Sequence, residues 1–309
     1  MTGHPIVPLT NGFTGTARWL QLAPRAFDDL VHSGGLPGSE DVGFWSSTAV
    51  VLLLPDLEGI RFEHDPRSQP ARIAETFVDP LRRLLPASLP AKNILVQALD
   101  RIGLASVVER FPAIITDMQV DRLVALAVDS YVCPFALNWL GETGRLKGDL
   151  NPIGLAAGEA AAAVLLEPSQ RGDQRATIAH IIAVATGKDA PIGEGEVAPL
   201  RGRVLAEVLQ PLLTNETADL YLDLNGEAWR AQEYGHALVG LVPKATGPST
   251  LHCPAIAIGD TGASSFVVNT IVSARSLQRG YARGSQVAVA TSQDTGEVAG
   301  LLLRSEQRS

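Results

Sequence analysis

The chain of 309 residues contains only two cysteines, Cys133 and Cys253. So few cysteines exclude a fold that depends on a disulfide framework, and neither lies in a CxxC or Cys/His spacing that would hold zinc. We therefore expect no disulfide, no metal site and no tightly bound cofactor. A reducing compartment, the cytoplasm, fits this cysteine content best.

Clustered positive charge and long apolar segments are also missing. The net charge is −8 and the isoelectric point is near 5.3, so no nucleic-acid partner is expected, since such binding needs clustered lysine and arginine. The longest apolar runs, Ala49 to Pro55 and Ala160 to Leu166, fall far short of the roughly 20 residues that cross a bilayer. Residues 1–12 lack the pattern of a signal peptide. We expect neither a membrane span nor a cleaved leader.

The apolar residues that are present, 46% of the chain, are enough for a large core. Short, continuously apolar runs such as Ala49 to Leu54 and Leu123 to Val128 predict strands that are buried on both faces. Amphipathic segments between such runs, including Arg18 to Val31 and Ala71 to Leu85, predict helices. This alternation is typical of an α/β fold.

The second half of the chain repeats the pattern of the first. Gly103 opens a predicted helix that leads into the apolar strand Val124 to Ser130, and Gly262 opens a helix that leads into Val287 to Gln293. The first copy contains an additional segment, Tyr131 to Ala157, that the second copy lacks. We therefore predict a duplication, with one half at residues 1–168 and the other at residues 169–309.

Several segments of this pattern resemble the β-ketoacyl synthases. Asn151 to Pro168 contains GLAAGEAAAAVLLEP and resembles the Gly-Glu-Gly-Ala turn that enters an apolar strand ending in Leu-Glu. Val124 to Ser130 resembles the strand before it, and Ile258 to Ser265 with Leu277 to Gly280 resembles the Gly-His, Gly-Ala-Ala and Leu-x-x-Gly helix. The resemblance runs from about residue 90 to residue 304. It implies the thiolase-like fold, in which duplicated βαβαβαββ halves form a five-layered α/β/α/β/α sandwich.

The catalytic positions of that family are altered in this chain. A ketosynthase uses a cysteine at the N-terminus of a buried helix, assisted by two histidines. The resemblance places the nucleophile at Arg101, within a residue or two, and residues 100–102 contain no thiol. Asn225 and Asp260 take the places of the two histidines, and Glu227 lies near Asn225. These four residues are the candidate site, and no condensing activity is expected.

Two functions follow from this resemblance. The first is a degenerate ketosynthase homologue that acts as a non-condensing subunit or scaffold. It would form a homodimer through the strand Asn93 to Val96, or a heterodimer with an active ketosynthase, and an acyl carrier protein is a further partner. The second is a cysteine-independent acyltransferase, decarboxylase or hydrolase that binds an acyl-CoA or acyl-carrier-protein thioester.

Two other motifs suggest different chemistry and fit it less well. Asp260 and Asp294 each begin an Asp-Thr-Gly sequence, as in aspartic proteases. They stand too close in the sequence to come from two separate lobes. His252 and Cys253 are a Cys/His pair, but adjacent side chains of an extended chain point to opposite faces.

Two polar residues and the two cysteines have structural interpretations as well. Asp260 precedes a helix that is predicted to begin near Thr261, so its whole role could be to cap the N-terminus of that helix. Arg230 could pair with Glu227 or Glu233 on an exposed helix face. Neither cysteine is expected at a helix N-terminus that would activate a thiol, so we expect both to be dispensable.

Overall fold

The computed structural model describes residues 3–62, 68–169, 177–189, 191, 201–241 and 250–306. Within this part of the chain, ten strands form two five-stranded sheets. In spatial order, the first sheet consists of β1 (Gly3–His4), β5 (Ala157–Leu166), β4 (Arg122–Ser130), β2 (Thr48–Leu54) and β3 (Ile94–Ala98). The second consists of β6 (Ala179–Lys188), β10 (Glu297–Ser305), β9 (Gln286–Ser292), β7 (Thr217–Leu222) and β8 (Thr250–His252).

Both sheets have the same topology. Counted within each half, the strands follow the order first, fifth, fourth, second, third, and the fifth strand is antiparallel to the fourth in both. This agreement confirms the predicted duplication. The halves differ at one edge, where β6 pairs antiparallel with β10 along its length while the two-residue β1 pairs parallel with β5.

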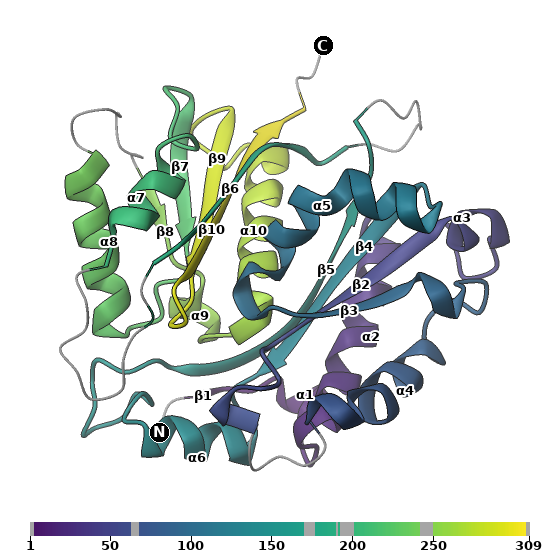
Figure 1. The fold of residues 1–309 in the computed structure, drawn as a ribbon, viewed down its shortest axis with the longest axis horizontal. Helices are drawn as coiled ribbons and strands as arrows, with labels where there is room; N and C mark the ends of the chain where they lie inside the picture. The colour runs from purple at the N-terminus through teal and green to yellow at the C-terminus, as the bar shows by residue number, and fades with distance from the viewer. Residues whose placement is uncertain are drawn as a thin grey trace.

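Helices form three layers around the two sheets (Figure 1). The central layer consists of α5 (Gly103–Met118) and α10 (Ser265–Arg279). The outer face of the first sheet is covered mainly by α2 (Gly15–Ser33), α3 (Val42–Ser46) and α4 (Asp79–Arg82). The outer face of the second is covered by α7 (Arg203–Leu209) and α8 (Ala228–Leu241). The expected five-layered α/β/α/β/α sandwich is therefore confirmed.

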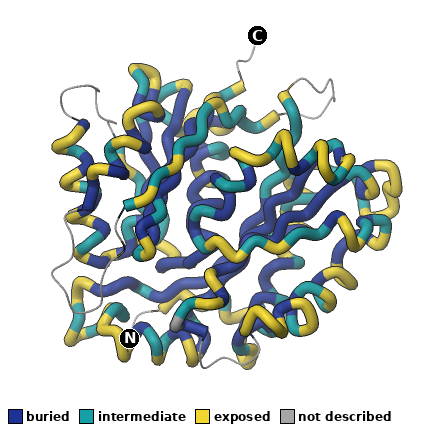
Figure 2. Tube along the Cα trace, viewed as in Figure 1, coloured by how far each residue is buried: buried dark blue, intermediate teal, exposed yellow. Residues whose placement is uncertain are grey.

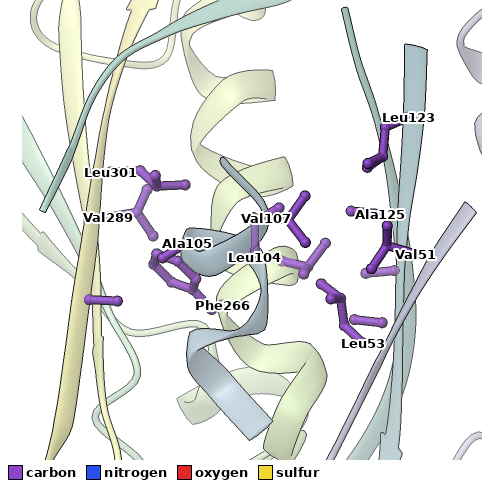
Figure 3. Packing of buried hydrophobic residues seen from close by; sticks show 14 of the residues in the cluster. Val51, Leu53, Leu104, Ala105, Val107, Leu123, Ala125, Phe266, Val289 and Leu301 are labelled. Carbon is purple, nitrogen blue, oxygen red and sulfur yellow. The ribbon is translucent and has the colours of Figure 1, made fainter. Parts of the chain in front are cut away.

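The apolar runs form strands with two buried faces because each sheet lies between two helical layers. In β2, Val51 and Leu53 pack in the central core, whereas Val50 and Leu52 pack in the outer core. Figure 3 shows Leu53 of the first sheet facing α5 and α10, with Val289 and Leu301 of the second sheet on the other side. The inner strands β2, β4 and β9 are accordingly buried along their whole length (Figure 2).

The segment predicted as a helix, Ala71 to Leu85, is helical from Pro70 to Arg82 but changes its hydrogen-bond pattern. A 3-10 turn, η2 (Pro70–Arg72), is followed by a π-helical turn, η3 (Ala74–Val78), and then by α4. Pro80 favours this change, because it has no N–H to donate one turn back. The helix is confirmed, and it ends three residues before the predicted Leu85.

The two central helices begin in the same way. The 3-10 turn η5 (Asp100–Ile102) leads into α5, and η6 (Gly262–Ser264) leads into α10. The first residues of the two turns, Asp100 and Gly262, have φ of 51° and 57°. This geometry matches Asp100 with Gly262, so the sequence alignment that paired Gly103 with Gly262 is one turn out of register.

The remaining short elements connect the layers. They are α1 (Val7–Thr10), α6 (Pro134–Glu142), α9 (Ala255–Ile258), η1 (Ile60–Phe62) and η4 (Ala91–Asn93). None of the helices in the described ranges is long and apolar enough to cross a bilayer.

Candidate functional site

The four predicted site residues come together where the two halves meet. Arg101 lies in η5 at the start of α5, and its Nη2 donates to both carboxylate oxygens of Asp260, at 2.7 and 2.8 Å. Asn225, between β7 and α8, donates its Nδ2 to Asp260 Oδ2 at 2.6 Å and to Glu227 Oε2 at 2.9 Å. The expectation that Asp260 lies near Arg101 and within reach of Asn225 is therefore confirmed. A catalytic role for these residues stays a prediction.

The Arg101–Asp260 pair is deeply buried. Asp260 is 1% exposed and Arg101 is 4% exposed. Burial alone would raise the pKa of Asp260, but the Arg101 guanidinium and the other donors around the carboxylate hold it well below its usual range. Burial alone would lower the pKa of Arg101, but the combined attraction of Asp260, Asp223 and the other acidic groups around it raises that pKa above its usual value. Both residues therefore stay charged at neutral pH.

A second arginine holds the other side of this site. Arg145 Nε and Nη2 donate to the two carboxylate oxygens of Glu227, at 2.7 and 3.1 Å, and Nη1 donates to Asp294 at 2.7 Å. Arg145 belongs to the additional segment between β4 and β5, for which the sequence comparison gave no role. Nothing in the local sequence around Arg145 indicated this contact.

A third carboxylate, Asp223, joins Arg101 to α8. Its Oδ2 accepts from Arg101 Nη1 at 3.3 Å, from Arg230 Nη1 at 3.0 Å and from Thr291 Oγ1 at 2.6 Å. The prediction that Arg230 lies on an exposed face was wrong, since Arg230 is 2% exposed. The predicted pairing with Glu227 is confirmed, with Arg230 Nε 3.7 Å from Glu227 Oε2. The helical spacing of Arg230 with buried Ala237 and Leu241 could have revealed this inward face.

The site has almost no free space. One cavity borders the ion pairs, with walls that include Arg101, Asp223, Asp260 and Asn269. Its volume is about 10 Å³, which is about the space of a single water molecule.

Asp260 binds a backbone N–H as well as the arginine. Its Oδ1 accepts from Gly262 N at 2.9 Å, so the carboxylate stabilises the first turn of η6. The α-helix itself begins at Ser265 and not near Thr261, because Gly262–Ser264 form a 3-10 turn first. The capping and site interpretations of Asp260 are therefore not exclusive.

Neither cysteine is a partner in these ion pairs. Cys133 is the N-cap residue of α6, so the expectation that neither cysteine lies at a helix N-terminus was wrong. Pro134 starts that helix at a position where proline is favoured. The Cys133 thiol is buried and points to the Ser130 carbonyl at 4.0 Å. Burial raises the pKa of the Cys253 thiol, which makes it a weaker nucleophile.

The two rival motifs are held in other pairs. Asp260 binds Arg101, whereas Asp294 binds Arg145, so each carboxylate of the aspartic-protease motif has its own cation. His252 Nε2 lies 2.8 Å from Asp219 Oδ1, and its ring stacks on Tyr221. In the described part of the chain, no group of three or more His, Cys, Asp or Glu side chains could hold a metal ion.

Comparison with known proteins gives a likeness of structure. No protein-family model and no curated protein matches the sequence. A type II polyketide ketosynthase, solved with its acyl carrier protein, is 13% identical with a TM-score of 0.70, over 94% of this chain and 85% of that one. A β-ketoacyl synthase from Burkholderia phymatum is 12% identical with a TM-score of 0.69, over 94% and 83% of the two chains. The ishigamide ketosynthase/chain length factor is 17% identical with a TM-score of 0.62, over 98% and 85%. This chain therefore has the thiolase-like fold of the ketosynthases.

Proposed function

We propose that this protein is a ketosynthase homologue without condensing activity, which acts in the cytoplasm as a non-condensing subunit or scaffold. The observation that supports this proposal best is the ion-pair network at the junction of the halves. At the positions that the resemblance assigns to the family's thiol and histidines, Asp260 accepts hydrogen bonds from both Arg101 and Asn225. They are held as parts of the structure and are not free to react.

The chemistry of these residues explains why acyl transfer is not expected. An arginine that carries a fixed positive charge has no lone pair with which to attack a thioester. Asp260 is neutralised by Arg101 and is a weak base, since its pKa is lowered. An acyl chain would also have to displace buried ion pairs, which costs several kcal/mol when one partner is left alone (about 3–5).

The alternative, a cysteine-independent acyltransferase, decarboxylase or hydrolase, needs a free acid or base in this site. Asn225, Glu227 and Asp260 are the residues that would have to supply it. Glu227 is held by Arg145 through two hydrogen bonds and by Asn225 through a third. None of the three is free, so the geometry favours the first function.

The thioester test of this proposal uses the purified protein with acetyl-CoA, malonyl-CoA and a malonyl-loaded acyl carrier protein. We expect no mass increase of the protein and no loss of thioester above the protein-free rate, measured by intact-mass spectrometry and thiol release. An active ketosynthase in the same assay is the positive control.

Acylation or thioester loss in this assay would contradict the proposal. The variants Cys133→Ser and Cys253→Ser would then locate the chemistry. Activity that either variant abolished would show that a thiol acts and that our view of both cysteines as dispensable is wrong. Activity that both variants kept would support the cysteine-independent alternative.

A partner subunit is proposed at the edge of the first sheet. β3 is the last strand of that sheet, and Val96 in its middle and Leu99 just after its end are 41% and 39% exposed. The Oε1 atom of Gln97 is buried and has no hydrogen-bond partner in the described part of the chain. An uncovered strand edge readily pairs with another chain. We infer that a second subunit covers it, either a second copy or an active ketosynthase, and that an acyl carrier protein is a further partner.

The association prediction is tested by light scattering at micromolar concentration. For the isolated protein we expect a mass twice that of the 32.7 kDa chain. The variant Val96→Lys should lower the mass to that of one chain, because it places a charge on the pairing edge. Val239→Lys, at a 74% exposed position on α8, is the matched control and should leave the dimer intact. A single-chain mass for the wild type would contradict the homodimer.

A further inference from the structure

Asp100 occupies an unusual backbone position at the junction of the two halves. It is the first residue of η5 and has a left-handed backbone, with φ of 51°. The equivalent residue of the other half is Gly262, with φ of 57°. Aspartate tolerates this conformation better than most residues that have a side chain. The first half thus carries a carboxyl group where the second half has no side chain at all.

One oxygen of the Asp100 carboxyl group lacks a partner. Its Oδ1 atom is buried and has no hydrogen-bond partner among the residues that the structure describes. Within the described ranges, Asp100 is in no ion pair. The charged groups that act on it are Arg101 on its own turn, Arg61 from η1, Asp129 from β4 and Asp294 from the β9–β10 turn. Two of these four charges repel an ionised Asp100.

Each arginine near Asp100 is already bound to another carboxylate. Arg61 donates to the two carboxylate oxygens of Asp129, at 2.9 and 2.7 Å. Arg101 donates to Asp260 and Asp223. An ionised Asp100 would therefore carry its charge on a half-buried carboxylate that has one buried, unsatisfied oxygen and no cation of its own, which is a costly arrangement.

The phenol of Tyr131 is the remaining titratable group close to Asp100. Burial raises the pKa of Tyr131 above its usual value, so the phenol stays neutral over the pH range in which proteins are stable. Tyr131 therefore adds no charge that could compensate an ionised Asp100.

We propose that Asp100 is a proton-binding site at the junction of the halves, and that release of its proton weakens the packing between η5 and η6. Burial raises the pKa of Asp100 to about 7, with Asp129 and Asp294 adding to the effect and Arg101 opposing it. The bound proton neutralises Asp100, as Arg61 neutralises Asp129 and Arg101 neutralises Asp260.

The direction of the pH effect follows from this proton. An unfolded chain releases the proton of Asp100 near pH 4, whereas the folded chain keeps it until about pH 7. The stabilisation that the proton gives is complete below pH 4 and is lost as the pH rises through 7. Relative to a variant without this carboxyl, the wild type should become less stable over that range.

The experiment compares the melting temperature of the wild type and of Asp100→Asn from pH 5 to pH 8.5. Asparagine keeps the left-handed backbone and the shape but does not ionise. We expect the wild type to lose several degrees relative to the variant over this range. Asp100→Gly, which copies the residue of the other half, should behave like Asp100→Asn. Asp149→Asn, at an exposed aspartate, should follow the wild type.

A carboxyl carbon NMR titration gives a second readout that does not depend on unfolding. With ¹³C-labelled aspartate, the signal that disappears in Asp100→Asn should titrate with a midpoint near 7. Parallel pH profiles of the wild type and Asp100→Asn, or a midpoint near 4, would overturn the proposal. Either result would show that Asp100 is ionised and has found a cation or solvent.

Discussion

Replacing Arg101 by methionine is expected to lower the free energy of unfolding by about 3–5 kcal/mol. The methionine side chain has a similar length but no charge. Asp260 would therefore stay ionised and buried without the Arg101 cation. The hydrogen bonds from Asn225 and from Gly262 N–H would remain, but neither brings a positive charge. The measurement is chemical denaturation of the full chain at pH 7, followed by circular dichroism.

Two controls separate this pair from ordinary charge removal. Arg203 pairs with Glu207 at 3.5 Å, with side chains that are 84% and 60% exposed, so Arg203→Met should cost at most about 1 kcal/mol. Adding Asp260→Leu to Arg101→Met should recover part of the loss, because it removes the unpaired charge. A cost for Arg101→Met as small as that for Arg203→Met would mean that the pair is open to solvent.

The same pair changes the expected result for Asp260→Asn. As a simple N-cap, Asp260 could be replaced by asparagine at almost no cost. Arg101 would then keep only Asp223 and Ser265 as strong acceptors, at 3.3 and 2.9 Å. We therefore expect a measurable loss of stability from this variant, smaller than that from Arg101→Met.

The residue pattern was sufficient to predict a duplicated α/β chain, because the signals for it are local, whereas the five-layered sandwich was implied by the resemblance to the ketosynthases. Continuous apolar runs such as Ala49 to Leu54 are typical of strands with two buried faces, and a repeated order of strands and helices indicates a duplication. The alignment of the two halves by sequence, however, was displaced by one helical turn at the start of the central helices. The left-handed backbone that matches Asp100 with Gly262 depends on φ, and Asp and Gly share no feature that a residue comparison would align.

The ion-pair network could be predicted only in part. The fold brings the starts of the two central helices together, which placed Asp260 beside Arg101. The partners Arg145 and Asp294 come from loops whose paths no periodicity fixes. They are 149 residues apart in the sequence, so only the folded chain shows that they touch. In addition, charged residues lie mostly on protein surfaces, so they are not expected in an internal network unless the sequence periodicity places them on a buried face.

Gly262 connects this network to the other half of the molecule. A Cβ atom at this position would lie 1.9 Å from Asp129 Oδ2 and 2.8 Å from its Cγ. Asp129 cannot move aside easily, because it is fully buried, is held by both Nη atoms of Arg61 and accepts from Ala263 N at 3.0 Å. An alanine side chain would have to push a hydrogen-bonded carboxylate away from its partners.

Gly262→Ala is therefore expected to destabilise the protein far more than the same change at Gly280. Both glycines have a left-handed backbone, with φ of 57° and 71°, but nothing lies within 4 Å of a Cβ built at Gly280. Gly280→Ala should cost only the backbone strain, about 1–2 kcal/mol. Gly262→Ala should cost about 1–3 kcal/mol more, because it overpacks a buried contact. Denaturation of the two variants side by side measures the difference, and equal costs would show that the two halves do not pack as tightly at Asp129 as the structure has them.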